Sequence, residues 1–283
     1  MYKLILIEGI PGSGKTTMSR LLYETLRDDG IKVEHFTEGD SHPADLSWQS
    51  ILTENEFTSL LAKYPDYENA LKNNTVLEDG LAITAYTLLN LNRDTELYRY
   101  LASHEIYSIN ADIDTFKQAH LTRWKKFVND SDSNTIYIFE CVLLQNHITQ
   151  LMLEYEASEE EIILYIQEFI EIIQAMSPII HYLSPTSVDQ AIRHVAEQRR
   201  PKYQDRRDIW IDRVIDYIAG TPYGERNGIK GIEGFIDFSS RRQLIERRLL
   251  NKLNVDTNCI EHDGLNWDWV LERILQHSKK KFT

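Results

Sequence analysis

The sequence predicts an α/β protein built on a doubly wound parallel sheet of about five strands. Short apolar runs that suit buried strands alternate with segments whose apolar residues recur at helical spacing. The stretch between the second and third runs lacks a strand pattern, so we expect a large helical insertion over residues 41–133. Strands that alternate with helices are joined most simply by parallel crossovers, and their ligands bind beyond the carboxyl ends of the strands.

The first candidate strand is residues 2–7, an apolar run typical of a strand that is covered on both faces. The other candidate strands are residues 31–37, 135–139, 178–185 and, with a weaker pattern, 255–261. Residues 159–176 predict a helix, because an acidic first turn precedes isoleucines at helical spacing. Within the insertion, helices are expected at residues 54–63, 80–90 and 113–128. We expect this insertion to belong to a single domain, 1–283, and to bind an acceptor.

A complete phosphate-binding motif follows the first strand. The residues that match G-x-x-x-x-G-K-[ST] and its next position are Gly9, Ile10, Pro11, Gly12, Ser13, Gly14, Lys15, Thr16 and Thr17. The glycines let backbone N–H groups turn inward around phosphate oxygens, and the following helix aims its positive dipole end at them. Lys15 is expected to contact the β- and γ-phosphates, and the Thr16 hydroxyl to bind Mg²⁺. A chance match is the alternative, but the strand before and the helix after favour a P-loop NTPase that binds ATP with Mg²⁺.

Acidic residues stand at the ends of two further candidate strands. Glu140 follows the run at 135–139, where this fold places a carboxylate near magnesium, directly or through water. Glu38 and Asp40 follow the second run, and either carboxylate would suit a general base that accepts a hydroxyl proton. The alternative for Glu140 is an exposed carboxylate at a strand end next to a turn, and the alternative for Glu38 or Asp40 is an ordinary loop acid.

The richest basic segment runs from residue 199 to 207, with one further arginine upstream on a helix. A concentration of guanidinium groups in an acidic protein indicates a phosphate clamp, and we place a candidate lid over residues 193–234. The alternative is a surface helix whose charges are offset by nearby acids. The stretch 220–234 holds five glycines and is either a mobile loop that closes on substrate or a connector between helices. The arginines of this hypothesis are Arg193, Arg199, Arg200 and Arg206.

Composition limits the partners. The formal net charge of −13 argues against binding of a nucleic acid polymer or an anionic membrane. The two cysteines, Cys141 and Cys259, have no paired spacing, which is typical of a reducing compartment. No apolar run approaches a membrane span, so a cytoplasmic protein is expected. The expected partner is a small-molecule acceptor, and a homodimer is left open.

In order along the chain, these features resemble P-loop nucleoside and nucleotide kinases. They are the phosphate-binding motif, the acidic end of the second strand, Phe139-Glu140, the Tyr182–Pro185 strand end followed by Arg193, and the arginine-rich segment. The sequence is similar to a divergent thymidylate-kinase-like member over residues 1–40 and 134–283. The resemblance implies that Lys15 and Thr16 bind the triphosphate and Mg²⁺, that Glu38 or Asp40 lies near the acceptor hydroxyl, and that the four arginines belong to a lid over ATP.

One departure from these kinases concerns the acceptor. They usually have arginine after the acid of the third strand, whereas Cys141 follows Glu140 here. The acceptor is therefore left open between a nucleoside, a nucleotide and another small metabolite. The first hypothesis is an ATP-dependent small-molecule kinase that transfers the γ-phosphate, with catalysis resting on positioning and charge neutralisation. The alternative is a P-loop ATPase or nucleotide-dependent switch that acts through a protein partner. A nucleotide-binding module with little turnover is a third hypothesis.

Overall fold

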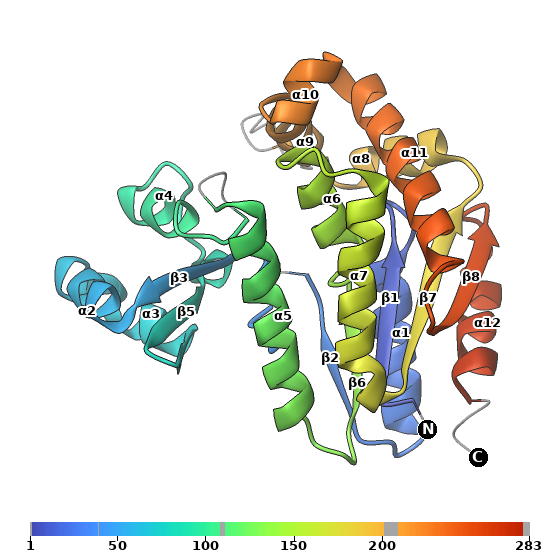
Figure 1. The fold of residues 1–283 in the computed structure, drawn as a ribbon, viewed down its shortest axis with the longest axis horizontal. Coiled ribbons are helices and arrows are strands. Elements are labelled where there is room, and N and C mark those ends of the chain that lie inside the picture. The colour runs from blue at the N-terminus through green and yellow to red at the C-terminus, as the bar shows by residue number, and fades with distance from the viewer. Residues whose placement is uncertain (1, 39, 108–110, 201–208, 280–283) are drawn as a thin grey trace. The chain divides into compact units, whose positions relative to one another are not determined.

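The computed structural model describes residues 2–38, 40–107, 111–200 and 209–279 (Figure 1). The chain divides into two compact units. The sheet unit comprises the described parts of Met1–His35 and Ser131–Thr283, and the inserted unit comprises those of Phe36–Asp130.

A five-stranded parallel sheet in the order β2-β6-β1-β7-β8 forms the centre of the sheet unit. This sheet confirms the predicted α/β class. Every residue of β1 is buried, because strands flank it on both sides and helices cover both faces. The bounds are β1 (Leu4–Gly9), β2 (Val33–Phe36), β6 (Ile136–Glu140), β7 (Pro178–Pro185) and β8 (Asp256–His262). Each strand expected from the sequence is present within a few residues of its predicted position.

Helices cover the two faces of this sheet (Figure 1). On one face α1 (Lys15–Asp28) and α12 (Trp267–Lys279) bury Leu22 and Ile274 in a common apolar core with the strands. On the other face lie α7 (Glu159–Ile173) and α11 (Gly231–Leu250). The remaining helical elements of the sheet unit are α6 (Gln145–Leu153), the 3-10 turn η3 (Gln174–Met176), α8 (Val188–Gln198), α9 (Trp210–Ala219) and α10 (Pro222–Asn227).

The predicted helix over residues 159–176 is confirmed as α7 followed by η3. Ser158 and Glu161 form a capping box at its start, because each side chain accepts a hydrogen bond from the other residue's backbone N–H. The glycine-rich stretch 220–234 is not a long loop, which corrects one of the two interpretations given above. Helix α10 occupies Pro222–Asn227, and α11 begins at Gly231.

The inserted unit corrects the expectation of an all-helical insertion, because it contains a three-stranded antiparallel sheet in the order β3-β5-β4. Its predicted helices over 54–63 and 113–128 are confirmed as α2 and α5. Its elements are β3 (Gln49–Thr53), α2 (Glu54–Lys63), η1 (Pro65–Tyr67), α3 (Glu68–Asn73), β4 (Thr75–Glu78), β5 (Leu81–Ala85), η2 (Tyr86–Leu89), α4 (Glu96–Ala102) and α5 (Ile113–Asp130).

The helix predicted over residues 80–90 is wrong, because a hairpin turn and a strand begin this segment. Asp79 and Gly80 have φ of 52° and 80°, the left-handed conformation that a two-residue turn between twisted strands requires. They join β4 to β5 with Glu78 opposite Leu81. Asp-Gly between two β-forming runs is the signal that indicates this hairpin, and it outweighs the helical spacing that follows.

Candidate functional site

The glycine-rich segment after β1 forms a tight loop at the centre of the sheet, and it ends in the first turn of α1. Gly9, Gly12 and Gly14 have φ of 145°, 81° and 85°, which side-chain-bearing residues rarely adopt. Gly14 is the N-cap residue of α1, so it offers no side chain to the first N–H groups of the helix. Such a loop presents backbone N–H groups and a positive helix end to an anion.

Trp267, which the sequence analysis does not single out, lies against this loop. It begins α12, and a Cβ atom added to Gly14 would lie 2.3 Å from an atom of its indole ring. His262, at the end of β8, places its imidazole 5.1 Å from the indole, measured between ring centroids. The last glycine of the motif is therefore required for close packing as well as for backbone conformation.

Replacing Gly14 by alanine is expected to lower the free energy of unfolding by about 1–3 kcal/mol, because the new methyl group overlaps Trp267. Gly30→Ala is the matched control, since Gly30 also has a positive φ of 77° but has no atom within 4 Å of an added Cβ. Urea denaturation of both variants measures the difference. Equal losses for the two variants would mean that Trp267 does not press on the loop.

Lys15 lies within the loop and is almost fully buried, at 6% exposed. Its ammonium donates a hydrogen bond to the backbone carbonyl of Ile10, at 2.9 Å. The lysine therefore folds back over the loop of which it is part. This places a positive charge beside the backbone N–H groups that would surround a phosphate.

Thr16 and Glu140, both predicted as magnesium ligands, are in direct contact. The Thr16 hydroxyl donates to Glu140 Oε1 at 2.5 Å. Parallel pairing of β1 and β6 puts Glu140 opposite Ile7, which brings the strand end to the loop. A hydroxyl beside a carboxylate is the hard-oxygen ligand set that Mg²⁺ prefers, so these two residues fit the ion.

Glu8 is a buried carboxyl that the sequence analysis does not use. It is the residue before the motif, it is fully buried, and it accepts hydrogen bonds from the backbone N–H groups of Leu143 and Gln145, at 2.7 and 3.1 Å. Burial raises the pKa of Glu8 to about 7, although these hydrogen bonds act in the opposite direction. Glu8 thereby fastens the turn that follows Glu140 to the end of β1.

The arginines of the predicted clamp contact groups of their own chain. Arg193 lies on α8 and pairs with Asp189 at 2.8 Å and with Glu233 at 2.5 Å. Arg199 lies over the Trp210 ring at 4.6 Å, and Arg200 pairs with Glu197 at 3.1 Å. Arg206 lies outside the described residues. These contacts match the surface-helix interpretation more closely than a preformed clamp, and the role of the arginines stays a prediction.

Glu38 and Asp40, the two candidate bases, belong to the inserted unit. The carboxylate of Asp40 accepts hydrogen bonds from the Thr37 backbone N–H at 2.6 Å and from its hydroxyl at 2.9 Å. Glu38 accepts from the indole N–H of Trp48 at 3.4 Å. Asp40 is therefore oriented by two short hydrogen bonds, whereas Glu38 is exposed and has one longer hydrogen bond.

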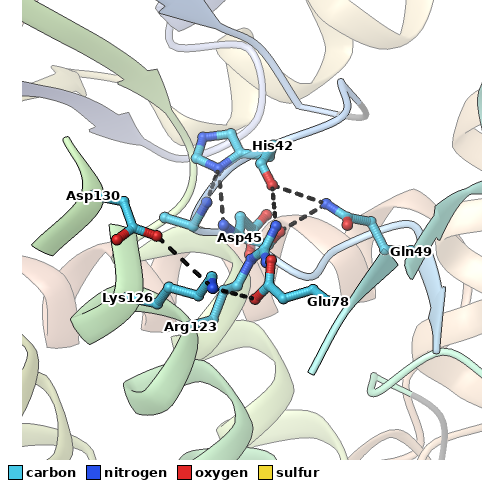
Figure 2. Close-up of polar contacts among 8 residues, drawn as sticks. His42, Asp45, Gln49, Glu78, Arg123, Lys126 and Asp130 are labelled. Carbon is cyan, nitrogen blue, oxygen red and sulfur yellow. Dashed lines mark hydrogen bonds and ion pairs between the residues drawn. The ribbon is translucent and has the colours of Figure 1, made fainter. Parts of the chain in front are cut away.

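A polar cluster in the inserted unit contacts the residues that follow Asp40, from His42 onward. Figure 2 shows the members of this cluster. The His42 Nδ1 atom accepts hydrogen bonds from the backbone N–H groups of Ala44 and Asp45, at 3.0 and 2.8 Å. Burial, with a contribution from the charge of Arg123, lowers the pKa of His42 to about 3. The imidazole is therefore neutral at pH 7.

Helix α5 and strand β4 complete the cluster (Figure 2). The buried guanidinium of Arg123 pairs with Glu78 and also donates to the His42 carbonyl at 3.5 Å. Lys126 lies 4.0 Å from Glu78 and 3.8 Å from Asp130. The cluster connects α5, β4 and the segment that follows Glu38 and Asp40. We therefore interpret it as a structural element that holds these three parts of the inserted unit together.

No protein-family model matches the chain, and no curated protein matches it in sequence. In the part of the chain that the structure describes, no helix has both the length and the apolar character needed to cross a bilayer.

Proposed function

We propose that the chain is a P-loop phosphotransferase, an ATP-dependent kinase that transfers the γ-phosphate to a hydroxyl or phosphate of a small acceptor. The contact between the Thr16 hydroxyl and the Glu140 carboxylate carries this proposal. It joins the end of the glycine-rich motif to the acid of the neighbouring strand, and magnesium nucleotides bind to this combination in P-loop NTPases. The positive-φ glycines and the buried Lys15 support the same proposal.

Each group has a separate task in the proposed reaction. The loop N–H groups between Gly9 and Thr17 bind the phosphate oxygens, and Lys15 neutralises negative charge on the β- and γ-phosphates. Thr16 and Glu140 would hold Mg²⁺, which supplies charge neutralisation at the transferred group. Catalysis then rests on positioning and electrostatics, because the protein forms no covalent bond to the phosphoryl group.

The transfer itself balances without a further reactant. The acceptor oxygen forms a bond to the γ-phosphorus while the bond from that phosphorus to the β–γ bridging oxygen breaks, and ADP leaves. When the acceptor is a hydroxyl, we assign its proton to the carboxylate of Glu38 or Asp40. The acidic segment after β2 supports this assignment, and Thr37 orients the Asp40 carboxylate through two hydrogen bonds.

A two-stage acceptor screen tests the function. Thermal shift with a non-hydrolysable ATP analogue and Mg²⁺ present is expected to give a further rise in melting temperature with the right nucleoside, nucleotide, sugar or aminocyclitol. The same compound is then expected to accelerate ADP formation from ATP and to become phosphorylated. If ADP and free phosphate form at one rate whatever compound is added, the chain is an ATPase and the kinase proposal is wrong.

Replacing the base is expected to slow transfer strongly and leave nucleotide binding nearly intact. Asp40→Asn or Glu38→Gln, whichever removes the base, should lower the transfer rate by about 10²–10⁴-fold, a usual contribution of general base catalysis. Asp66→Asn is the control, because Asp66 is an exposed acid of the same unit. Rates of acceptor phosphorylation are compared with the affinity for the ATP analogue. Full transfer by both variants would exclude both carboxylates as the base.

A further inference from the structure

Arg242 contacts the phosphate-binding loop, although it lies 233 positions after Gly9 in the sequence. Arg242 lies in the middle of α11 and is 3% exposed. One terminal nitrogen donates to Thr149 Oγ1 at 2.7 Å, and the other to the Gly9 carbonyl at 3.4 Å and to Gln145 Oε1 at 3.5 Å. A single planar guanidinium therefore contacts the loop entrance and helix α6 simultaneously.

The same guanidinium is held in place from its other side. Arg242 Nε forms an ion pair with Glu246 Oε1 at 3.0 Å, one turn later on α11. The other oxygen of Glu246 accepts a hydrogen bond from the Tyr182 hydroxyl of β7 at 2.5 Å. Glu246 is fully buried, so its position follows from these two partners and not from solvent. All three nitrogen atoms of the Arg242 guanidinium thus have partners within the chain.

The contacts of Arg242 lie close to the Thr16–Glu140 pair in the sequence and in the fold. Gly9 is the last residue of β1, and α6 begins at Gln145, shortly after Glu140. Glu8 accepts N–H groups of the same turn, so two side chains fasten this turn to the end of β1. The turn that these two side chains fasten begins directly after Glu140, the last residue of β6, whose carboxylate accepts the hydrogen bond of Thr16.

Stability alone is a weak reason for this arrangement. A buried ion pair contributes little net stability, because desolvation of both charges offsets their attraction, and apolar residues of similar volume often serve as well. The geometry instead suits the precise placement of the groups that bind the nucleotide, since misplacing a reacting group by about 1 Å can reduce a rate 10²-fold. An arginine provides several donors in fixed directions, which neither lysine nor an apolar side chain does.

We propose that Arg242 is a positioning residue, whose guanidinium sets the distance between the phosphate-binding loop and the turn that directly follows Glu140. This inference rests on the proposed phosphotransferase function and adds a residue to it. Arg242 acts through Gly9 and α6, so its loss weakens the part of nucleotide binding that depends on magnesium.

The test measures the dissociation constant of a fluorescent non-hydrolysable ATP analogue with Mg²⁺ and with EDTA. For Arg242→Met we expect the gain in affinity from Mg²⁺ to fall about 10-fold, because Thr16 and Glu140 no longer hold their separation. Arg241→Met is the matched control, since Arg241 is the preceding residue on α11, is exposed, and places its guanidinium 5.8 Å from the centre of the Tyr223 ring. Mg²⁺ should raise the nucleotide affinity of Arg241→Met as much as it raises that of the wild type.

Two further variants separate positioning from stability. Arg242→Lys keeps a charge beside Glu246 but cannot reach Gly9 and Thr149 together, so it should fold and still lose most of the gain from Mg²⁺. The double variant Arg242→Met/Glu246→Gln leaves no unpaired buried carboxylate and keeps an acceptor for Tyr182. Its melting temperature should return toward that of the wild type while its gain from Mg²⁺ stays low.

The outcomes distinguish this inference from the function on which it rests. The positioning role alone would be overturned if Mg²⁺ raised the nucleotide affinity of Arg242→Lys as much as that of the wild type. It would also be overturned if the double variant recovered both its melting temperature and its magnesium-dependent affinity. Absence of any magnesium-dependent nucleotide binding by the wild-type chain would overturn the proposed function, and the positioning role with it.

Discussion

Replacing Lys15 by alanine is expected to lower the rate of ADP formation from ATP by about 10²–10³-fold, the loss typical of removing a preorganised group that stabilises developing charge. The Lys15 ammonium lies 2.9 Å from the Ile10 carbonyl, so the loop already holds it where phosphate oxygens would bind. Charge on the phosphates changes as the bond to the leaving group breaks, and a fixed ammonium stabilises that change. Initial rates of ADP formation with saturating Mg²⁺ measure the effect.

Lys252→Ala is the control for this variant, because Lys252 is an exposed lysine of the same unit. It should retain the wild-type rate. Circular dichroism of both variants tests whether the fold is intact, since Lys15 is buried and its removal leaves space in the loop. A Lys15→Ala variant that is folded and fully active would remove Lys15 from the proposed mechanism.

Replacing Glu140 by glutamine is expected to raise the Mg²⁺ concentration needed for half-maximal activity by about 10–100-fold. Glutamine has nearly the same shape as glutamate and can still accept the Thr16 hydrogen bond, but it carries no negative charge. The variant therefore tests the charge and not the packing. Titration of Mg²⁺ at a fixed ATP concentration gives the half-maximal value.

Glu261→Gln is the matched control for Glu140, because Glu261 also stands near the end of a parallel strand, β8, but pairs with Arg247 at the surface. Its magnesium dependence should equal that of the wild type. If Glu140→Gln has the same magnesium dependence as this control, Glu140 is a structural carboxylate and the metal is held elsewhere.

The features that the sequence predicts correctly depend mainly on residues that are close together in the sequence. The glycine-rich motif lies within one strand–loop–helix unit, so its residues and its conformation are coded together. Buried parallel strands need unbroken apolar runs, which is why β1 and β7 are visible in the chain. The sequence also predicts Thr16 and Glu140 as magnesium ligands, because the carboxyl ends of parallel strands meet at one edge of the sheet, and the structure shows the two side chains in contact.

The features that the sequence analysis misses depend on contacts between distant segments. Trp267 lies against Gly14, and Arg242 reaches Gly9, only after α11 and α12 have packed on the sheet. An arginine in a helix with further arginines on either side looks like a surface residue, and Arg242 is the buried member of such a run. The β4–β5 hairpin is different, since its Asp79-Gly80 turn is a local signal that could have been used.

Calorimetric titration of the wild-type chain with a non-hydrolysable ATP analogue tests the central claim, that the loop between Gly9 and Thr17 binds nucleoside triphosphate phosphates. We expect one binding site per chain in the presence of Mg²⁺, with an affinity that falls when EDTA removes the metal, because Thr16 and Glu140 then have no ion to share with the phosphates. Saturable binding that Mg²⁺ does not change, or no binding under either condition, would contradict it.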